Sequence, residues 1–253
     1  MKHLELEIFN NLFASICDEM GVSLCRSSFS PNIKERKDFS CALFDPEGRM
    51  VAQAAHIPVH LGSMAYAAAG VIADHRPRPG EVLIFNDPYR GGTHLPDITL
   101  LEPVELDGRV LGYLANRAHH ADIGGITAAS MPIARHIDEE GLRLEPQVLY
   151  AHGRWNDALM TFIQSQVRTP AERAGDLRAQ LAALHTGRER LRDAARRYGE
   201  ACLLGAMDDL IVCAENESRA VLADVPDGDY TFRDVLDDDG AVSYTHLTLP
   251  TIL

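Results

Sequence analysis

Apolar residues follow a helical period at both ends of the chain. Near the N-terminus they recur every four positions, which predicts a helix over residues 4–20 with Gly21 as its C′ residue. After residue 157 the period is helical again. It predicts one helix that begins at the capping box Thr169-Pro170-Ala171-Glu172 and ends at Gly199, and a second over 200–223.

Between these helical regions, short apolar runs bounded by turn residues predict strands. Asp45-Pro46-Glu47-Gly48 and Asp107-Gly108 are turn sequences, so each predicts a hairpin. The expected elements are a hairpin over 38–53, a helix over 61–73, strands over 81–85 and 97–101, a hairpin over 102–115 and, late in the chain, a strand over 230–235.

This order of elements predicts a mixed α+β fold, with short strands and hairpins in the first 150 residues and a helical region after them. We expect an α+β part over 1–156 and a helical part, with one strand, over 157–240. Residues 241–253 carry no charge, and Val242–Thr251 resembles the translation of a sequencing-library adaptor. We therefore expect 241–253 to be a non-native tail of a shortened reading frame; a terminal strand is the alternative.

The chain is acidic, with 24 Lys and Arg against 37 Asp and Glu and a net charge of −13. This balance argues against nucleic acid or an anionic membrane as a partner, because both need clustered positive charge. No apolar run reaches the roughly 18 residues of a bilayer span. The five cysteines form no CxxC pair, so we expect buried or unreactive thiols and a cytoplasmic protein.

Candidate chemistry is concentrated in two loops that each follow a predicted strand. The first, Asn86–Asp97, contains His94 and Asp97 three positions apart, with Gly91-Gly92 before them. Imidazole and carboxylate together suit Mn, Fe or Zn. We therefore predict a divalent metal site at His94 and Asp97, and Asp87 is a further candidate catalytic carboxylate.

The second loop, Asn116–Gly125, contains two consecutive histidines. In an extended chain His120 and Asp122 share one face and His119 points to the other, so either histidine could be the metal ligand. Asp122 could orient an imidazole or act as a general base. Ordinary polar turn chemistry is the alternative for both loops.

Other segments are weaker candidates. His56 and His60 are four residues apart, but Pro58 between them disfavours a helical metal pair. Glu35 lies in a charged loop and is a possible further carboxylate ligand. The chain has neither a GxSxG nucleophile elbow nor a phosphate-binding P-loop.

Four blocks of sequence resemble the hydantoinase B/oxoprolinase family. They are Ser30–Asp45, His56–Met64 and the two loops Asn86–Asp97 and Asn116–Gly125. The resemblance runs over most of residues 5–240. Full members of the family are much longer, which agrees with a shortened reading frame.

The resemblance implies an ATP-dependent amidohydrolase with two kinds of subunit. An A-type ATPase would activate the carbonyl of a cyclic amide such as 5-oxoproline or a hydantoin, and the B-type part would complete ring opening. We expect this chain to be the B-type part of a hetero-oligomer, with ATP bound by the partner.

The resemblance also implies site residues. Carboxylase relatives carry manganese on a His-x-x-Asp pair and a downstream histidine, which match His94, Asp97 and His119, and Glu35 corresponds to a carboxylate ligand. His120 or Asp122 would then move the proton. The alternatives are a metal-dependent carboxylase subunit of the acetone carboxylase kind and a non-catalytic scaffold fragment.

Overall fold

The computed structural model describes residues 3–127 and 132–233. Residues up to Glu215 form one compact unit, and the chain from Asn216 onward forms a second. The first unit continues across residue 156, where the sequence suggested a division. The charge-free tail over 241–253 lies outside the described residues.

The first unit is built on one antiparallel sheet of seven strands. In spatial order they are β2 (Met50–Ala55), β1 (Phe39–Phe44), β5 (Arg109–His119), β4 (Asp97–Leu106), β3 (Glu81–Phe85), β6 (Gln147–Ala151) and β7 (Arg154–Trp155). Strands and helices thus share one unit, and the prediction of a mixed α+β fold is confirmed.

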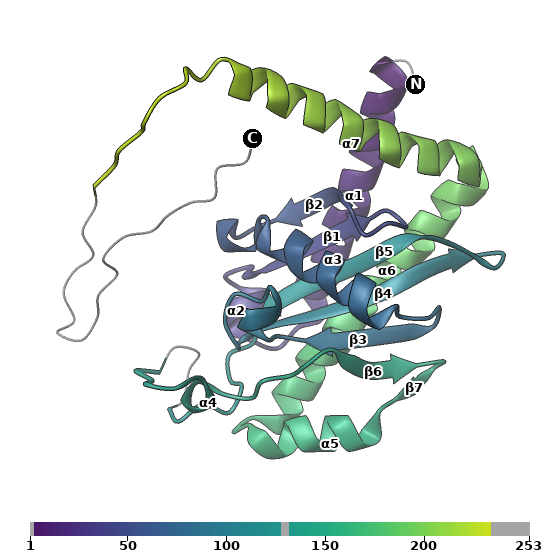
Figure 1. Ribbon diagram of the computed structural model, residues 1–253. Coiled ribbons are helices and arrows are strands. Elements are labelled where there is room, and N and C mark those ends of the chain that lie inside the picture. Colours follow the sequence, from purple (N-terminus) through teal and green to yellow (C-terminus); the bar gives the residue numbers. More distant parts are fainter. Residues whose placement is uncertain (1–2, 128–131, 234–253) are drawn as a thin grey trace. The chain divides into compact units, whose positions relative to one another are not determined.

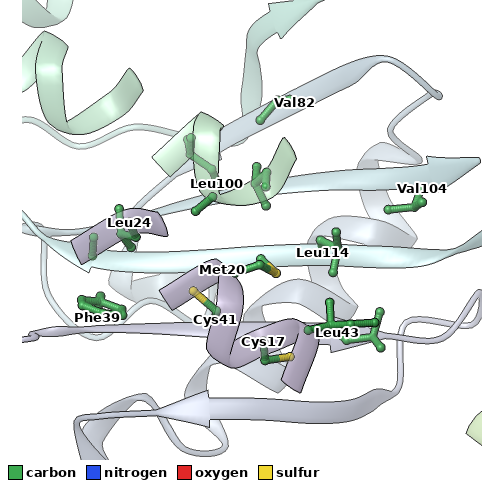
Figure 2. Packing of buried hydrophobic residues seen from close by; sticks show 14 of the residues in the cluster. Cys17, Met20, Leu24, Phe39, Cys41, Leu43, Val82, Leu100, Val104 and Leu114 are labelled. Atoms are coloured by element: carbon green, nitrogen blue, oxygen red, sulfur yellow. The ribbon is translucent and has the colours of Figure 1, made fainter. Parts of the chain in front are cut away.

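Helices cover both faces of this sheet (Figure 1). The short helix α3 (Ser63–His75) packs on one face, against Phe44, Phe85 and Leu101. The long helices α1 (His3–Ser27) and α6 (Pro170–Tyr198) pack on the other. Figure 2 shows Cys17, Met20 and Leu24 of α1 lying over the strands on that face.

The remaining helices are short, except for α7. They are α2 (Pro31–Lys34), η1 (Pro58–His60), η2 (Pro88–Arg90), α4 (Ile137–Glu140), α5 (Asp157–Gln166) and α7 (Glu200–Ala223). The two 3₁₀ turns matter most here, because η1 contains His60 and η2 lies within the candidate loop Asn86–Asp97.

Helix α1 continues beyond the predicted end at Gly21 and ends at Ser27. Gly21 is an interior residue of the helix, and a Cβ atom there would lie 3.1 Å from the Phe39 ring. The glycine therefore allows α1 to lie close to β1 and does not end the helix. The prediction of a C′ residue at this position is wrong.

The predicted strand over 97–101 and hairpin over 102–115 are parts of one longer hairpin, β4–β5, paired from Asp97↔His119 to Leu106↔Arg109. Its turn has φ of +51° at Asp107 and +84° at Gly108. Two positive φ values are typical of the type I′ turn that joins twisted strands. The turn prediction is confirmed, but the sequence underestimates the length of both strands.

Two further predictions need correction. Pro170 begins α6 and Gly199 ends it, as expected, but the Thr169 side chain makes no capping hydrogen bond. Glu172 instead lies 3.4 Å from the Arg173 guanidinium. In the second unit, the described residues after α7 form turns and extended chain through Arg233, and no strand begins at Tyr230.

No helix within residues 3–127 and 132–233 has an apolar stretch long enough to cross a bilayer.

Candidate metal centre

The antiparallel order of three strands brings the candidate residues to one edge of the sheet. Strand β4 begins at Asp97 where its neighbour β5 ends at His119, and the two residues are directly paired. Strand β1 begins beside the same end of β5, because Phe39 pairs with Ala118. Asp38, Asp97 and His119 therefore lie side by side, although they are far apart in the sequence.

Asp97 is the centre of this cluster and is 1% exposed. Its Oδ2 atom lies 3.3 Å from His94 Nδ1 and 3.2 Å from His60 Nε2, and Thr93 Oγ1 donates a hydrogen bond to the same oxygen. Its Oδ1 atom lies 3.4 Å from His119 Nδ1. Three imidazoles and one hydroxyl therefore surround a single carboxylate.

Two overlapping groups in this cluster have the spacing of metal ligands. They are His94, Asp97 and His119, and Asp38, His60 and Asp97; within each group the candidate ligand atoms lie within 4.8 Å of one another.

The first group also contains polar atoms that need a partner. His94 Nε2, His119 Nε2 and Asp97 Oδ1 are buried and make no hydrogen bond to the described residues. Buried polar atoms are nearly always satisfied in proteins, so these three atoms are available to bind a further group. Two imidazoles and a carboxylate are a donor set that suits Mn, Fe or Zn, so these residues fit a divalent ion.

The protonation states also suit a divalent cation. Burial lowers the pKa of His94, and the nearby Asp97 charge opposes this only in part. Burial alone would raise the pKa of Asp97, but interactions with His119 and His60 bring it well below its usual value. An imidazole must be neutral and a carboxylate ionised to bind a metal ion. The lowered pKa of His94 favours its neutral form at neutral pH, and the lowered pKa of Asp97 favours its ionised form.

His119 and His120 have separate environments, as expected for consecutive residues of an extended chain. His119 lies beside Asp97 and Asp38. His120 is 0% exposed, and its Nε2 lies 2.9 Å from Gln180 Oε1 of α6. Burial, with the charge of Arg173, lowers the pKa of His120 to about 4. Of the two histidines, the structure therefore places His119 in the cluster.

The other predicted site residues belong to neither group of candidate ligands. Asp122 accepts hydrogen bonds from the Gly124 and Arg168 backbone amides and the Arg168 side chain. Asp87 caps η2 by accepting from the Tyr89 amide. Glu35 is exposed at the C-terminal end of α2 and belongs to neither group of three.

The glycine pair of the first loop makes close contacts within the protein. A Cβ atom on Gly91 would lie 2.7 Å from the Ala67 backbone of α3, and one on Gly92 would lie 2.7 Å from the Asp87 carbonyl oxygen. The two glycines thus allow the loop to lie against α3 and fold back on itself, which places His94 beside Asp97.

Arg117 is a buried cation near the cluster that the sequence did not single out. It donates to Thr99 Oγ1 at 2.9 Å, to Ser63 Oγ at 3.0 Å and to the Gly91 carbonyl oxygen at 3.4 Å. Burial lowers its pKa to about 10, and the Asp97 charge opposes that shift. Arg117 therefore links β4, α3 and the His94 loop and adds positive potential beside Asp97.

The model of the hydantoinase B/oxoprolinase family matches residues 2–252. The chain belongs to this family. It is 38% identical to a 5-oxoprolinase of Dictyostelium discoideum over 223 residues, which is 87% of this chain and 18% of that protein.

Two solved structures share the fold. The crystal structure of the ATP-dependent caprolactamase from Pseudomonas jessenii has a TM-score of 0.87 and 32% identity, and the match covers 95% of this chain and 42% of that one. Nucleotide-free acetone carboxylase has a TM-score of 0.71 at 20% identity, which shows a common fold alone. This member of the hydantoinase B family therefore spans less than half of the relatives it matches.

Proposed function

We propose that this chain is the metal-binding portion of a B-type subunit that completes the ATP-dependent opening of a cyclic amide. The observation that carries the proposal is the buried cluster around Asp97, which has the spacing and the unpartnered atoms of a metal site. Membership of the hydantoinase B/oxoprolinase family and similarity to a 5-oxoprolinase and a caprolactamase support a cyclic amide as the substrate.

His94, Asp97 and His119 would hold the ion, and manganese is our first choice, with iron and zinc as alternatives. When bound, such an ion supplies Lewis-acid polarisation of a carbonyl and lowers the pKa of coordinated water toward ~7. The side chain of His94 is 31% exposed, whereas those of Asp97 and His119 are 1% and 9% exposed. A small substrate would therefore approach from the His94 side.

The chain's own residues would set the charge of the site. The ionised Asp97 carries a negative charge, and the buried Arg117 offsets part of it. Arg117 would therefore reduce the repulsion between the site and the anionic groups that form when an amide carbonyl is activated and hydrolysed. Proton transfer by Asp87, His120 or Asp122 stays a prediction.

ATP is expected on an A-type ATPase partner in a hetero-oligomer, because no phosphate-binding P-loop occurs in this sequence. Such a partner would form the activated amide, and the present chain would take part in the step that follows.

A chimeric enzyme tests the proposal. Residues 3–233 would replace the matching segment of the Dictyostelium discoideum 5-oxoprolinase, and ATP-dependent opening of 5-oxoproline would be measured. We expect a manganese-dependent activity that Asp97→Asn reduces at least ~100-fold, because the site loses its central charged ligand.

The matched control is Asp74→Asn, which alters an exposed carboxylate on α3 that pairs with Arg90. It should retain the activity of the unmodified chimera. A folded chimera that Asp97→Asn leaves fully active would contradict the proposal, and so would one that fixes bicarbonate without opening the ring.

A further inference from the structure

His60 is a fully buried histidine whose two ring nitrogens both have partners. It ends η1, is 0% exposed, and its ring contacts residues of β1 and β4. Its Nδ1 atom lies 3.0 Å from Ser40 Oγ, and its Nε2 atom lies 3.2 Å from Asp97 Oδ2. The three side chains form one continuous chain of hydrogen bonds, Ser40–His60–Asp97.

The chemistry of the two ends determines the position of the imidazole proton. An ionised carboxylate can only accept, so His60 donates to Asp97 from Nε2. The Nδ1 atom of a neutral imidazole is then an acceptor, and the Ser40 hydroxyl donates to it. Ser40 thus holds His60 in the tautomer that donates to Asp97.

The two oxygens of Asp97 have different surroundings. Oδ2 receives hydrogen bonds from His60 and Thr93, whereas Oδ1 is buried and receives none from the described residues. We infer that His60 is a positioning residue, which fixes the rotation of the Asp97 carboxylate and leaves Oδ1 as the ligand oxygen. This inference rests on the proposed metal site.

His119, the neighbouring candidate ligand, also has a side chain beside its ring. Asp38 Oδ2 lies 3.4 Å from His119 Nδ1, and His119 Nε2 has no hydrogen-bond partner among the described residues. Carboxylates and imidazoles that hold metal ligands in this way raise metal affinity. Asp38 therefore faces Nδ1 of His119, the ring nitrogen other than the unpartnered Nε2.

A second ion held by Asp38, His60 and Asp97 is the alternative. These three residues have suitable spacing. However, both nitrogens of His60 already have partners, and Thr93 donates to Asp97 Oδ2, the same oxygen that His60 contacts. The observations favour a positioning role.

Titration of the full 253-residue chain with Mn²⁺ by calorimetry tests the inference. The unmodified chain should bind one ion. His60→Ala should bind one ion 10- to 100-fold more weakly, the loss typical of a residue that holds a metal ligand. His60→Gln, whose amide can still donate to Asp97, should recover most of the affinity, and Ser40→Ala should lose about threefold.

The control is His75→Ala, an exposed histidine at the end of α3, which should bind as the unmodified chain does. The spectrum of bound Co²⁺ should change in His60→Ala and return in His60→Gln, which a general loss of folding would not produce. If His60→Ala fails to fold, the Mn²⁺ affinities of His60→Gln and Ser40→Ala can still be compared with that of the unmodified chain.

The outcomes separate the two claims. Two ions in the unmodified chain and one in His60→Ala would overturn the positioning role and assign His60 as a ligand. Equal affinity in His60→Ala and the unmodified chain would also overturn it. Absence of any binding by the unmodified chain would contradict the proposed metal site itself.

Discussion

At the scale of single residues, the site depends on how one carboxylate is surrounded. Asp97 is buried among His60, His94 and His119, and it stays ionised because these imidazoles and Thr93 replace the water it has lost. A buried carboxylate with a single partner behaves differently, and Glu102 on the same strand is the example.

The free energy of unfolding should depend on pH through Glu102, because the partners of this carboxyl group do not fully compensate for its burial. Burial raises its pKa to about 7, although Arg188 donates to it at 2.8 Å. Between about pH 4.5 and pH 7 the folded state therefore retains a proton that the unfolded state releases, so the free energy of unfolding falls as the pH rises. The fall attributable to this group is at most about 3 kcal/mol.

Urea unfolding of Glu102→Gln at pH 5 and pH 8 measures this effect. The difference between the two pH values should be smaller in the variant than in the unmodified chain, by ~1–3 kcal/mol. The exposed Glu145→Gln should behave as the unmodified chain does. An identical pH dependence in all three proteins would show that Glu102 has an ordinary pKa.

The sequence identifies His94, Asp97 and His119 as candidates because loops rich in histidine, aspartate and glycine follow apolar strands. It leaves the choice between His119 and His120 open. It makes His60 only a weak candidate and does not indicate that Asp38 lies near the site. The reason is physical: Asp38 reaches the cluster only because β1 pairs with β5. That pairing joins distant segments, which local periodicity does not reveal.

At the scale of elements, two helical glycines differ in how closely they are packed. Gly187 of α6 faces α1, and a Cβ atom there would lie 2.4 Å from Met20 Sδ and 2.9 Å from Leu114 Cδ1. A Cβ atom on Gly205 of α7 would have none of the described residues' atoms within 4 Å. Substituting each glycine therefore distinguishes the effect of packing on stability from the effect of helix propensity.

We expect Gly187→Ala to lower the free energy of unfolding by ~1–3 kcal/mol, because the added methyl group forces α6 away from α1. Gly205→Ala should raise it by up to ~1 kcal/mol, because alanine favours the helix and meets no neighbour. Chemical unfolding of both variants measures the difference. A stabilised Gly187→Ala would contradict the α1–α6 contact.

Elements with a regular period or strong turn signals are predictable, including α3, α6, the β1–β2 hairpin and the type I′ turn. Two of the errors have a common feature, which is that a residue with a strong local signal makes a different contact in the folded chain. Gly21 looks like a helix end, but it is an interior residue of α1 that lies close to the Phe39 ring. Thr169 and Glu172 look like a capping box, but Glu172 pairs with Arg173.

At the scale of the whole molecule, the core around the sheet should protect two thiols. Cys17 of α1 and Cys41 of β1 are both 0% exposed, and burial raises the pKa of Cys17 to about 12 and that of Cys41 well above its usual value. Cys202 on α7 is exposed. Only a thiolate reacts readily, so the folded chain should discriminate between these residues.

Labelling with a maleimide at pH 8 and peptide mapping by mass spectrometry tests the arrangement. Cys202 should react within minutes, and Cys17 and Cys41 should react only after unfolding in urea. Rapid labelling of Cys41 in the native chain would contradict the packing of α1 on the sheet.

The most direct test of the proposed metal centre is to find out where a divalent ion binds. Crystals of the chain grown with Mn²⁺ would be measured near the manganese absorption edge, and the anomalous difference map would show where manganese binds. We predict one strong peak within ~2.0–2.4 Å of side-chain atoms of His94, Asp97 and His119, and none in crystals of Asp97→Asn. A strong peak elsewhere, or no peak beside Asp97 in the unmodified chain, would contradict the assignment of this cluster as a metal centre.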